Sequence, residues 1–458
     1  MITAALAKFA IEQPASALAP RIVQLATAGL IDTLACALAG QDETVVRLAR
    51  GFISPAGGAA TASLWGQPGR FRPGDAAFVN GIAAHALDFD DNMPSLRGHP
   101  STTILPAALA AAQACNASGL EALAAYVVGI EIAGKVGLAM GAGHYLRGFH
   151  PTATVGIYGA TAAAARLFGL DAAGLAMAWG LAASQAAGLI GNFGTMAKPF
   201  HAGHAARCAV DSVLLVRAGM TANPAIFDGP RSVIVTQGGE GGEGGEGGLP
   251  LSAEGLGQPW EIETPGLYVK QWPCCYCSHR PIAGLLELVR RHGIEPDEIL
   301  RVDIGFPPGT DLGLIKSRPT TGLGGKFSVE YTAAALLLDG VVNQASFTEA
   351  MLNRPAVQRL MDRCHSHAIK DGRRWSATVG YNDVAIETPR GRFALRVDST
   401  PGSPECPLSK AELQAKFTDC ARPALGLELT QQLLPIAQGM ASLTSCRELL
   451  EALSKEKV

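Results

Sequence analysis

The sequence predicts a mainly α protein, in which a large all-α helical domain carries a smaller, inserted α+β domain as a lid. Its 458 residues exceed one ordinary core, and they are 48% hydrophobic and only 17% charged, which suits closely packed helices. Apolar residues recur at helical spacing through the first 220 residues, whereas strand-like alternation begins only after residue 265. Helical periodicity returns from Ser409. We therefore expect a helical domain of residues 1–265 and 403–458, with the α+β lid at 266–402.

In the helical domain, each predicted helix has apolar residues at helical spacing and ends on a glycine or a polar turn. Residues 57–73 are rich in glycine and proline, which predicts a loop with a short strand-like patch at 60–65. Residues 237–248 hold three Gly-Gly-Glu repeats, which we interpret as a tolerated surface insertion rather than a mobile flap. The predicted helices cover residues 17–38, 44–53, 74–87, 103–115, 119–140, 153–168, 171–188 and 202–218.

In the α+β domain, short alternating segments predict strands. The segment 300–306 alternates and is stopped by two prolines, and Pro389-Arg-Gly391 predicts a hairpin turn between two further strands. The predicted strands are 300–306, 376–379, 383–388 and 392–397, and the predicted helices are 279–292, 328–339, 346–351 and 355–365.

Composition argues against several classes of partner and compartment. A net charge of −3 and 6% aromatic residues offer neither a basic surface nor a stacking platform for nucleic acid. The longest apolar run, 123–142, carries Glu131 and Lys135 at i,i+4, a pairing typical of a soluble helix. Ten cysteines in so long a chain fit a reducing cytosol rather than a disulfide framework, and the N-terminus does not read as a signal peptide. We expect a cytoplasmic protein with no nucleic-acid or membrane partner.

The most charged stretch lies between two apolar helices, at residues 85–101. Burying so many ionisable groups is costly unless they pair or take part in chemistry, so the stretch predicts a site. The alternative is an Asp-rich N-cap beside a surface loop. The ionisable residues are His85, Asp88, Asp90, Asp91, Arg97 and His99.

A second cluster precedes the helix predicted at 153–168. His150 stands before Pro151, which favours an extended or turning backbone, and Tyr145 and Arg147 lie just upstream. A lone histidine here would more simply be a hydrogen-bonding residue at a helix end, and that alternative stays open.

Lys198 precedes Pro199 at a helix start whose first turns carry His201 and His204. A lysine at a helix N-terminus faces the unfavourable end of the helix dipole, so we expect the pKa of Lys198 to be depressed. A purely structural position would more naturally hold a carboxylate.

The α+β domain opens with a cysteine-rich segment. Cys274 and Cys277 form a C-x-x-C pair, and a zinc site could be completed by Cys364, His365 and His367. Cys275 interrupts the pair and the chain has no second one, so we expect no metal. We expect no nucleotide cofactor either, because the chain lacks a G-x-G-x-x-G after a strand and a Walker sequence.

Four further polar residues of this domain suit a carboxylate. His279 and Arg280 begin a predicted helix, where they could hold one. The segment Gly-Lys-Phe-Ser-Val-Glu-Tyr adds Lys326 and Tyr331, although Tyr331 could equally be a core aromatic.

Seven motifs occur in order: His-x-x-Asp-Phe-Asp-Asp, Gly-His-Pro-Ser, Gly-Phe-His-Pro-Thr, Lys-Pro-Phe-His-x-Gly, Phe-Asp-Gly-Pro-Arg-Ser, Pro-Cys-Cys and Lys-Phe-Ser-x-x-Tyr. Together they resemble the MmgE/PrpD family, which includes 2-methylcitrate dehydratase, cis-aconitate decarboxylase and iminodisuccinate epimerase. The resemblance implies a helical domain, a lid-like α+β domain, a cofactor-free site in the cleft between them, and a homodimer. It maps the family's site residues onto Asp88, His99, His150, Lys198, His279 and Tyr331.

One departure guides the choice of branch. The dehydratase and decarboxylase members continue the Asp-rich motif with Thr-Trp, where this chain has Asn92-Met93, and this chain also has Arg97 before Gly98-His99. We therefore favour the epimerase branch, with the dehydratase and decarboxylase reactions as alternatives.

The expected function is a cofactor-independent epimerase of a small dicarboxylate or tricarboxylate of the iminodisuccinate type. Removing a proton beside a carboxylate requires a base and fixed positive charge. We expect Lys198 as one acid/base group and Tyr145 or His150 as the other, with Asp88 orienting His99 or tuning Lys198. The expected substrate-binding residues are Arg97, Arg147, His279, Arg280, Lys326 and Tyr331. Two rivals remain: a non-catalytic carboxylate-binding helical protein and a metal-dependent hydrolase.

Overall fold

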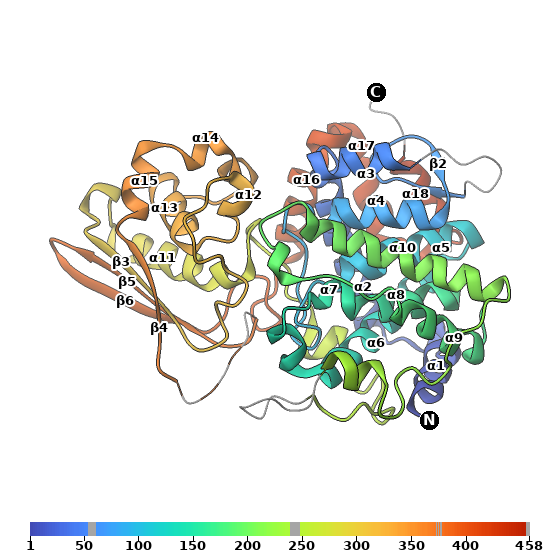
Figure 1. Cartoon of the computed structure of the whole chain (residues 1–458). Coiled ribbons are helices and arrows are strands. Elements are labelled where there is room, and N and C mark those ends of the chain that lie inside the picture. Colours follow the sequence, from blue (N-terminus) through green and yellow to red (C-terminus); the bar gives the residue numbers. More distant parts are fainter. Residues whose placement is uncertain (54–60, 239–247, 372, 374, 376–377, 455–458) are drawn as a thin grey trace.

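The chain folds into two lobes, a larger helical one and a smaller one that contains a sheet (Figure 1). A computed structural model describes residues 1–53, 61–238, 248–371, 373, 375 and 378–454. Most of the Gly-Gly-Glu segment, at 239–247, lies outside the described residues. The protein is mainly α, as the sequence predicts.

The larger lobe consists of helices whose starts carry recognisable signals. Proline occupies the first position of α2 and of α4, and Ser118 caps α6 in a reciprocal capping box with Glu121. The helices are α1 (Ile2–Glu12), α2 (Pro20–Gly40), α3 (Thr44–Phe52), α4 (Pro73–His85), α5 (Ser101–Cys115), α6 (Gly119–Leu146), α7 (Pro151–Thr154), α8 (Gly156–Leu167), α9 (Ala172–Ala183), α10 (Ala197–Arg217), α16 (Lys410–Leu425), α17 (Leu427–Gln438) and α18 (Arg447–Ala452).

Glycines allow α4 and α10 to touch backbone to backbone. A Cβ atom on Gly203 would lie 2.2 Å from the carbonyl oxygen of Phe78, and one on Gly81 would lie 2.8 Å from the Cα of Gly203. Any larger residue at either position would force the helices apart. This close contact brings the start of α10 next to the end of α4, where the Asp-rich turn begins.

The two lobes have separate hydrophobic cores. The larger core gathers buried side chains from Leu6 to Ile262 and again from Phe417 to Leu453. The smaller core takes its side chains from Trp272 to Val397. The chain therefore leaves the helical lobe, builds the second lobe, and returns so that α16 packs on α2.

The smaller lobe is built on a four-stranded sheet with the order β4-β3-β5-β6. Strand β3 (Arg301–Phe306) pairs in parallel with β4 (Cys364–Ala368) and antiparallel with β5 (Asn382–Thr388), which forms a hairpin with β6 (Gly391–Val397). Helix α11 (His279–His292) packs on the sheet, because a Cβ on its Gly284 would lie 2.6 Å from side-chain atoms of Val384 and Val397. The remaining helices are α12 (Gly322–Gly325), α13 (Val329–Asp339), α14 (Glu349–Leu352) and α15 (Pro355–Met361).

Several expected boundaries are wrong. The helix expected at 355–365 stops at Met361, and Cys364 begins β4 because it pairs with Val302 of β3. The helical lobe also contains a small hairpin, β1 (Ala62–Ser63) with β2 (Arg70–Phe71), so this lobe is not strictly all-α. The helix expected at 153–168 is divided at Val155 into α7 and α8. Of the strand expected at 376–379, residues 376–377 lie outside the described residues, and 378–379 are not in a strand.

Short single-turn segments connect these elements. The 3-10 turns are Ala15–Ala17, Ile190–Asn192, Tyr276–Ser278, Pro296–Glu298, Gln344–Phe347 and Met440–Ser442, and the π turns are Ile234–Gly238 and Ile262–Gly266.

Two helices, α2 and α6, are long and apolar enough to cross a membrane. Their most apolar windows are 67% and 89% buried inside the protein. Burial of that kind is what the core helices of a folded lobe show, so neither helix is evidence for a membrane span.

Candidate active site

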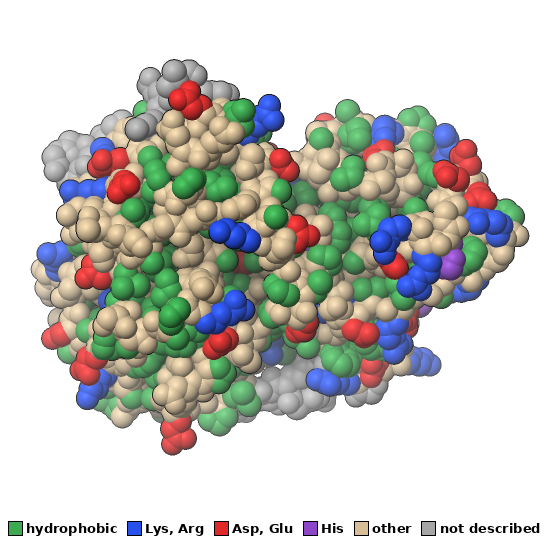
Figure 2. Space-filling view, turned by 180° about the vertical axis from the view of Figure 1, so that it is seen from behind, with side chains coloured by type: hydrophobic (Ala, Val, Ile, Leu, Met, Phe, Trp, Pro, Cys, Tyr) green, Lys and Arg blue, Asp and Glu red, His purple; other side chains and the backbone are tan. Residues whose placement is uncertain are grey.

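A cavity of about 850 Å³ is lined by residues of both lobes. Its wall includes one side of α6, the Asp-rich turn, the first turn of α10, and segments 270–277 and 309–313 of the second lobe. Figure 2 shows one outer face of both lobes, on which basic and acidic side chains are interspersed without a continuous basic stripe. Several buried charged groups lie in the cavity wall, among them Asp88, Lys198 and Lys270.

The Asp-rich turn begins where α4 ends at His85. Two of its residues, Asp88 and Arg97, have left-handed backbone conformations, with φ of 53° and 56°. Such conformations cost about 1–3 kcal/mol for residues other than glycine and are retained where the surroundings impose them. Both residues line the cavity, so two backbone positions of the cavity wall are strained.

Two lysines share one carboxylate oxygen at the centre of the site. Lys198 and Lys270 both pair with Oδ1 of Asp88, the latter at 3.1 Å, and Lys270 also donates to the Asp88 carbonyl at 2.8 Å. All three side chains are almost completely buried. Burial alone would raise the pKa of Asp88, but the two ammonium groups hold it far below its usual range, and Asp88 in turn raises the pKa of Lys270.

The sequence analysis did not identify Lys270. It is fully buried, 72 residues beyond Lys198 in the chain, and its partner is the backbone and side chain of Asp88, 182 residues away. Its only sequence signal was its position at the start of the cysteine-rich segment, so the pairing could be found only in three dimensions.

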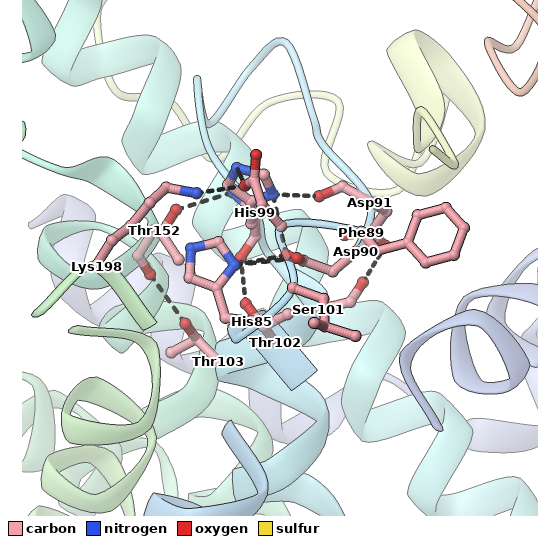
Figure 3. Close-up of polar contacts among 12 residues, drawn as sticks. His85, Phe89, Asp90, Asp91, His99, Ser101, Thr102, Thr103, Thr152 and Lys198 are labelled. Carbon is pink, nitrogen blue, oxygen red and sulfur yellow. Dashed lines mark hydrogen bonds and ion pairs between the residues drawn. The ribbon is translucent and has the colours of Figure 1, made fainter. Parts of the chain in front are cut away.

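Asp90 holds two imidazoles, as Figure 3 shows. His85 Nδ1 lies 2.9 Å from Asp90 Oδ2, and His99 Nδ1 lies 3.0 Å from the same oxygen and 2.8 Å from the carbonyl of Asp91. Burial lowers the pKa of His85 to about 3 and also lowers the pKa of His99. Asp90 therefore fixes the ring orientation and tautomer of His99, the member of this trio that lines the cavity.

His150 faces a second histidine rather than a carboxylate. Its Nδ1 lies 3.1 Å from Nδ1 of His201, so one ring donates and the other accepts, and at least one is neutral. Burial, with the nearby charge of Lys198, lowers the pKa of His150 well below its usual range. Its Nε2 has no hydrogen-bond partner among the described residues, and His150 lines the cavity. A neutral imidazole nitrogen is thus left for a bound molecule.

Tyr145 reaches the cavity because α6 bends. Gly141 interrupts the helix with φ 67° and ψ −175°, a conformation that favours glycine, and Tyr145 follows one turn later. Burial raises the pKa of Tyr145 well above its usual range, so its phenol remains protonated at neutral pH.

Behind Asp90, Asp91 is a buried carboxyl group that does not reach the cavity. Ser101 donates to Asp91 and lies 2.5 Å from the hydroxyl of Tyr126. Burial, with the nearby charge of Asp32, raises the pKa of Asp91 to about 8. The carboxyl group is therefore mostly protonated at neutral pH, and it anchors the turn to α5 and α6.

Lys416, on α16, ties the turn to the rest of the protein. Its ammonium group pairs with Asp32 of α2 at 2.6 Å and donates to the carbonyls of Phe89 and Lys270 at 2.9 and 2.8 Å. One buried side chain thus holds the turn, the segment that carries Lys270, and the first long helix. We call these contacts the Lys416 node.

Comparison with known proteins places this arrangement in a family. Residues 4–240 match the MmgE/PrpD N-terminal domain, and residues 272–439 match the MmgE/PrpD C-terminal domain. The chain belongs to the MmgE/PrpD family. The family assignment made from the sequence motifs is thereby confirmed.

Among relatives of this MmgE/PrpD protein, the human protein named cis-aconitate decarboxylase is 28% identical over 94% of this chain and 89% of its own length. The mouse protein of the same name is 29% identical, covering 87% of this chain and 82% of its own. An Aspergillus oryzae protein named cis-aconitate decarboxylase-like protein oryM is 28% identical over 99% of this chain and 98% of its own length. These names support the decarboxylase alternative, and the epimerase branch favoured from Asn92-Met93 finds no support among them.

Of the residues proposed for the site from the sequence, six line the cavity of this MmgE/PrpD protein. They come from four separate places along the chain: the Asp-rich turn, α6, the start of α7 and the start of α10. They are Asp88, Arg97, His99, Tyr145, His150 and Lys198.

The other five lie away from the cavity wall and bind backbone carbonyls instead. Arg147 is exposed and donates to Gln237, while His279 donates to Trp272 at 3.1 Å and stacks on Tyr276. Burial lowers the pKa of His279 to about 3, so its ring is neutral at physiological pH. Neither residue lines the cavity, and a contact of either with the substrate stays a prediction.

Arg280, Lys326 and Tyr331 are also structural in this conformation. Arg280 donates to the carbonyls of Thr378 and Asp398. Lys326 donates to Leu87 and Pro273, both at 2.8 Å, and so links the two lobes, while burial lowers its pKa to about 8. Tyr331 donates to the carbonyl of Ser346 within the smaller core. Each satisfies a carbonyl rather than facing the cavity.

One group of side chains could hold a metal ion. Within the described part of the chain, His85, Asp88, Asp90 and His99 bring one ligand atom each to within 4.8 Å of one another. A cation there would compete with two ammonium groups for Asp88 and with two imidazole N–H groups for Asp90. The residues therefore fit a hydrogen-bonded acid/base cluster better than a cation site. The set considered from the sequence, Cys274, Cys277, Cys364, His365 and His367, is not among the metal-like groups of the described residues.

Proposed function

We propose that this protein is a decarboxylase of a small unsaturated tricarboxylate such as cis-aconitate, working without a cofactor. The observation that carries the proposal is the pair of ammonium groups on Asp88, with Arg97 on the same cavity wall. Two lysines on one carboxylate leave a surplus of fixed positive charge, which suits a polyanionic substrate. The relatives that cover most of the chain carry the name of this activity.

Decarboxylation of cis-aconitate requires a proton donor more than a base. When the carboxylate on the CH2 group leaves as CO2, its bonding electrons form a new C=C bond. The original double bond then shifts its electrons to the CH carbon, which takes up one proton. The product is a 2-methylidene dicarboxylate, and the two carboxylates that remain require cationic partners.

Lys198 suits the role of that donor. Its Nζ pairs with Asp88 in the cavity wall, where it can present an N–H to a bound substrate. Tyr145, as a protonated phenol, is the second possible donor. Arg97 and Lys270, both in the cavity wall, supply positive charge for the retained carboxylates.

The second lobe contributes Lys270 and part of the cavity wall, so we also propose that it acts as the lid in the domain division expected from the sequence. Lys326 would be one of its fixed points, because it bonds carbonyls on both sides of the lobe boundary. A homodimer remains an expectation from the family resemblance.

The test is incubation of the purified protein with cis-aconitate, 2-methylcitrate and iminodisuccinate stereoisomers in D2O, followed by NMR. We expect CO2 release from cis-aconitate and one deuterium in the CH2 group beside a product carboxylate. Lys198→Ala should lose activity by at least about 100-fold, since general acid catalysis contributes about 10²–10⁴-fold. The matched control is Lys8→Ala, on an exposed side chain.

Three results would contradict the proposal. Inversion of iminodisuccinate without decarboxylation of cis-aconitate would restore the epimerase hypothesis, and dehydration of 2-methylcitrate alone would assign the dehydratase branch. Binding of all three compounds without turnover would indicate a carboxylate-binding protein.

A further inference from the structure

Two cysteines of the cavity wall have not been used by the proposed reaction. Cys275 and Cys277 both line the cavity, and together with Phe327 they form a small buried cluster of their own. Cys275 is 8% exposed and Cys277 is 2% exposed. The neighbouring Cys274 is fully buried in the core of the second lobe, so its side chain packs in a different cluster from those of Cys275 and Cys277.

The two sulfur atoms border the same small space beside Gly313. A Cβ atom on Gly313 would lie 3.0 Å from Sγ of Cys275 and 3.3 Å from Sγ of Cys277. Because Gly313 lacks a side chain, both sulfurs can occupy the space in front of it. The two cysteines are also two residues apart at the beginning of a 3-10 turn, which keeps their backbones close.

The surroundings of Cys275 favour a thiolate. The thiol and the backbone N–H of Cys277 both donate to the Cys275 sulfur, and they outweigh burial and the Asp88 charge, which act against the thiolate more strongly than Lys270 favours it. These donors, with the thiol of Cys277 first, lower the pKa of Cys275, whereas its own partner Cys277 keeps a pKa well above the usual value. Hydrogen bonds to the sulfur favour a reactive thiolate, and a second cysteine beside it can resolve the oxidised form.

We propose that Cys275 and Cys277 form an oxidisable dithiol in the cavity wall, which a peroxide converts into a disulfide that lowers the activity of the site. In the first step, the Cys275 thiolate attacks one peroxide oxygen, an S–O bond forms, the O–O bond breaks, and the departing hydroxide takes up a proton. In the second step, Cys277 attacks the sulfenic sulfur, an S–S bond forms, and water leaves. Two thiols are oxidised, and hydrogen peroxide is reduced to two molecules of water.

The first readout does not depend on catalysis. The full-length protein is treated with hydrogen peroxide, denatured, labelled with N-ethylmaleimide and digested with trypsin, which does not cut between Arg280 and Pro281. The peptide 271–290 therefore contains Cys274, Cys275 and Cys277 together. We expect a single label, on Cys274, and a peptide about 2 Da lighter at the other two cysteines, with three labels after dithiothreitol.

The second readout is activity, compared for each variant with its own untreated sample. Peroxide should lower wild-type turnover by at least about tenfold, and dithiothreitol should restore it, because a disulfide is reversible. In Cys277→Ser the resolving thiol is absent, so Cys275 should proceed to sulfinic acid and its loss of activity should resist dithiothreitol. Cys115→Ser, on an exposed cysteine outside the cavity, should respond as the wild type does.

Three labels on the peptide from inactivated protein, or a disulfide that contains Cys274, would overturn the proposal. Formation of the Cys275–Cys277 disulfide with undiminished turnover would overturn its effect on the site. Since the mass measurement needs no substrate, failure of the dithiol proposal can be distinguished from failure of the proposed decarboxylase activity.

Discussion

Replacing Lys416 by methionine should destabilise the whole protein. Methionine keeps an unbranched side chain but has no donor, so the pairing with Asp32 and the bonds to the carbonyls of Phe89 and Lys270 are lost together. Removing one partner of a buried ion pair costs about 3–5 kcal/mol, and each carbonyl left without a donor adds about 1–3 kcal/mol. Asp32 can limit the first cost by taking up a proton, because burial already raises its pKa. We expect a net loss of about 4–6 kcal/mol in the free energy of unfolding.

The assay is urea unfolding followed by circular dichroism, at neutral pH. Lys410→Met, at an exposed position of the same helix, is the matched control and should change stability by less than about 0.5 kcal/mol. The double variant Lys416→Met with Asp32→Asn should recover about 1–3 kcal/mol relative to Lys416→Met, because the uncompensated carboxylate is gone. A Lys416→Met protein within about 1 kcal/mol of the wild type would refute the stabilising role of the Lys416 node. Equal stability of the single and double variants would show that the unpaired Asp32 charge is not the cause.

Three further substitutions test individual groups. Asp91→Asn should flatten the dependence of the unfolding midpoint on pH between pH 5 and 8. In the folded protein the pKa of the buried Asp91 carboxyl group is raised to about 8, whereas in the unfolded chain it is about 3.9, so only the folded protein keeps this proton. The stability of the wild type therefore falls as the pH rises through this window. A slope as steep as in the wild type would contradict the protonated assignment. Asp88→Asn should lower kcat by at least about 100-fold, because the two lysines lose the charge that positions them, and a steady-state assay with unchanged kcat would exclude Asp88 from the site. Tyr331→Phe should keep kcat/KM within about twofold, and it should lower the free energy of unfolding by about 1 kcal/mol because the hydrogen bond to Ser346 is lost. A large loss of activity in a stable variant would instead indicate that Tyr331 contacts the substrate.

Periodicity predicted the fold well where contacts are local. The helix expected at 279–292 is observed at the same bounds in α11, and the strands at β3, β5 and β6 are within one residue of their predictions. Strand β4 was missed because its sequence, Cys-His-Ser-His-Ala, has little apolar alternation and forms a strand only by pairing with β3, about sixty residues earlier. Such a strand is a product of tertiary pairing rather than of propensity.

The candidate site was predictable only in part, for a related reason. Asp88, His99 and Lys198 stand at junctions between apolar helices, where a charge without a local partner indicates a site. A donor such as Arg280 or Lys326 looks the same in the sequence whether it faces a cavity or a backbone carbonyl. Nothing in the sequence around Lys416 indicated its role, because one of its partners, Phe89, is 327 residues away.

The separation of Lys416 from the rest of the helical lobe has a consequence for synthesis on the ribosome. About 200 residues, including the whole second lobe, are translated between the end of α10 and Lys416, which takes on the order of 10–40 s at about 5–20 residues per second. During that interval Asp32 has no ammonium partner, and the face of α2 that later receives α16 remains exposed on the nascent chain. Completion of the helical lobe therefore has to wait until α16 has been synthesised.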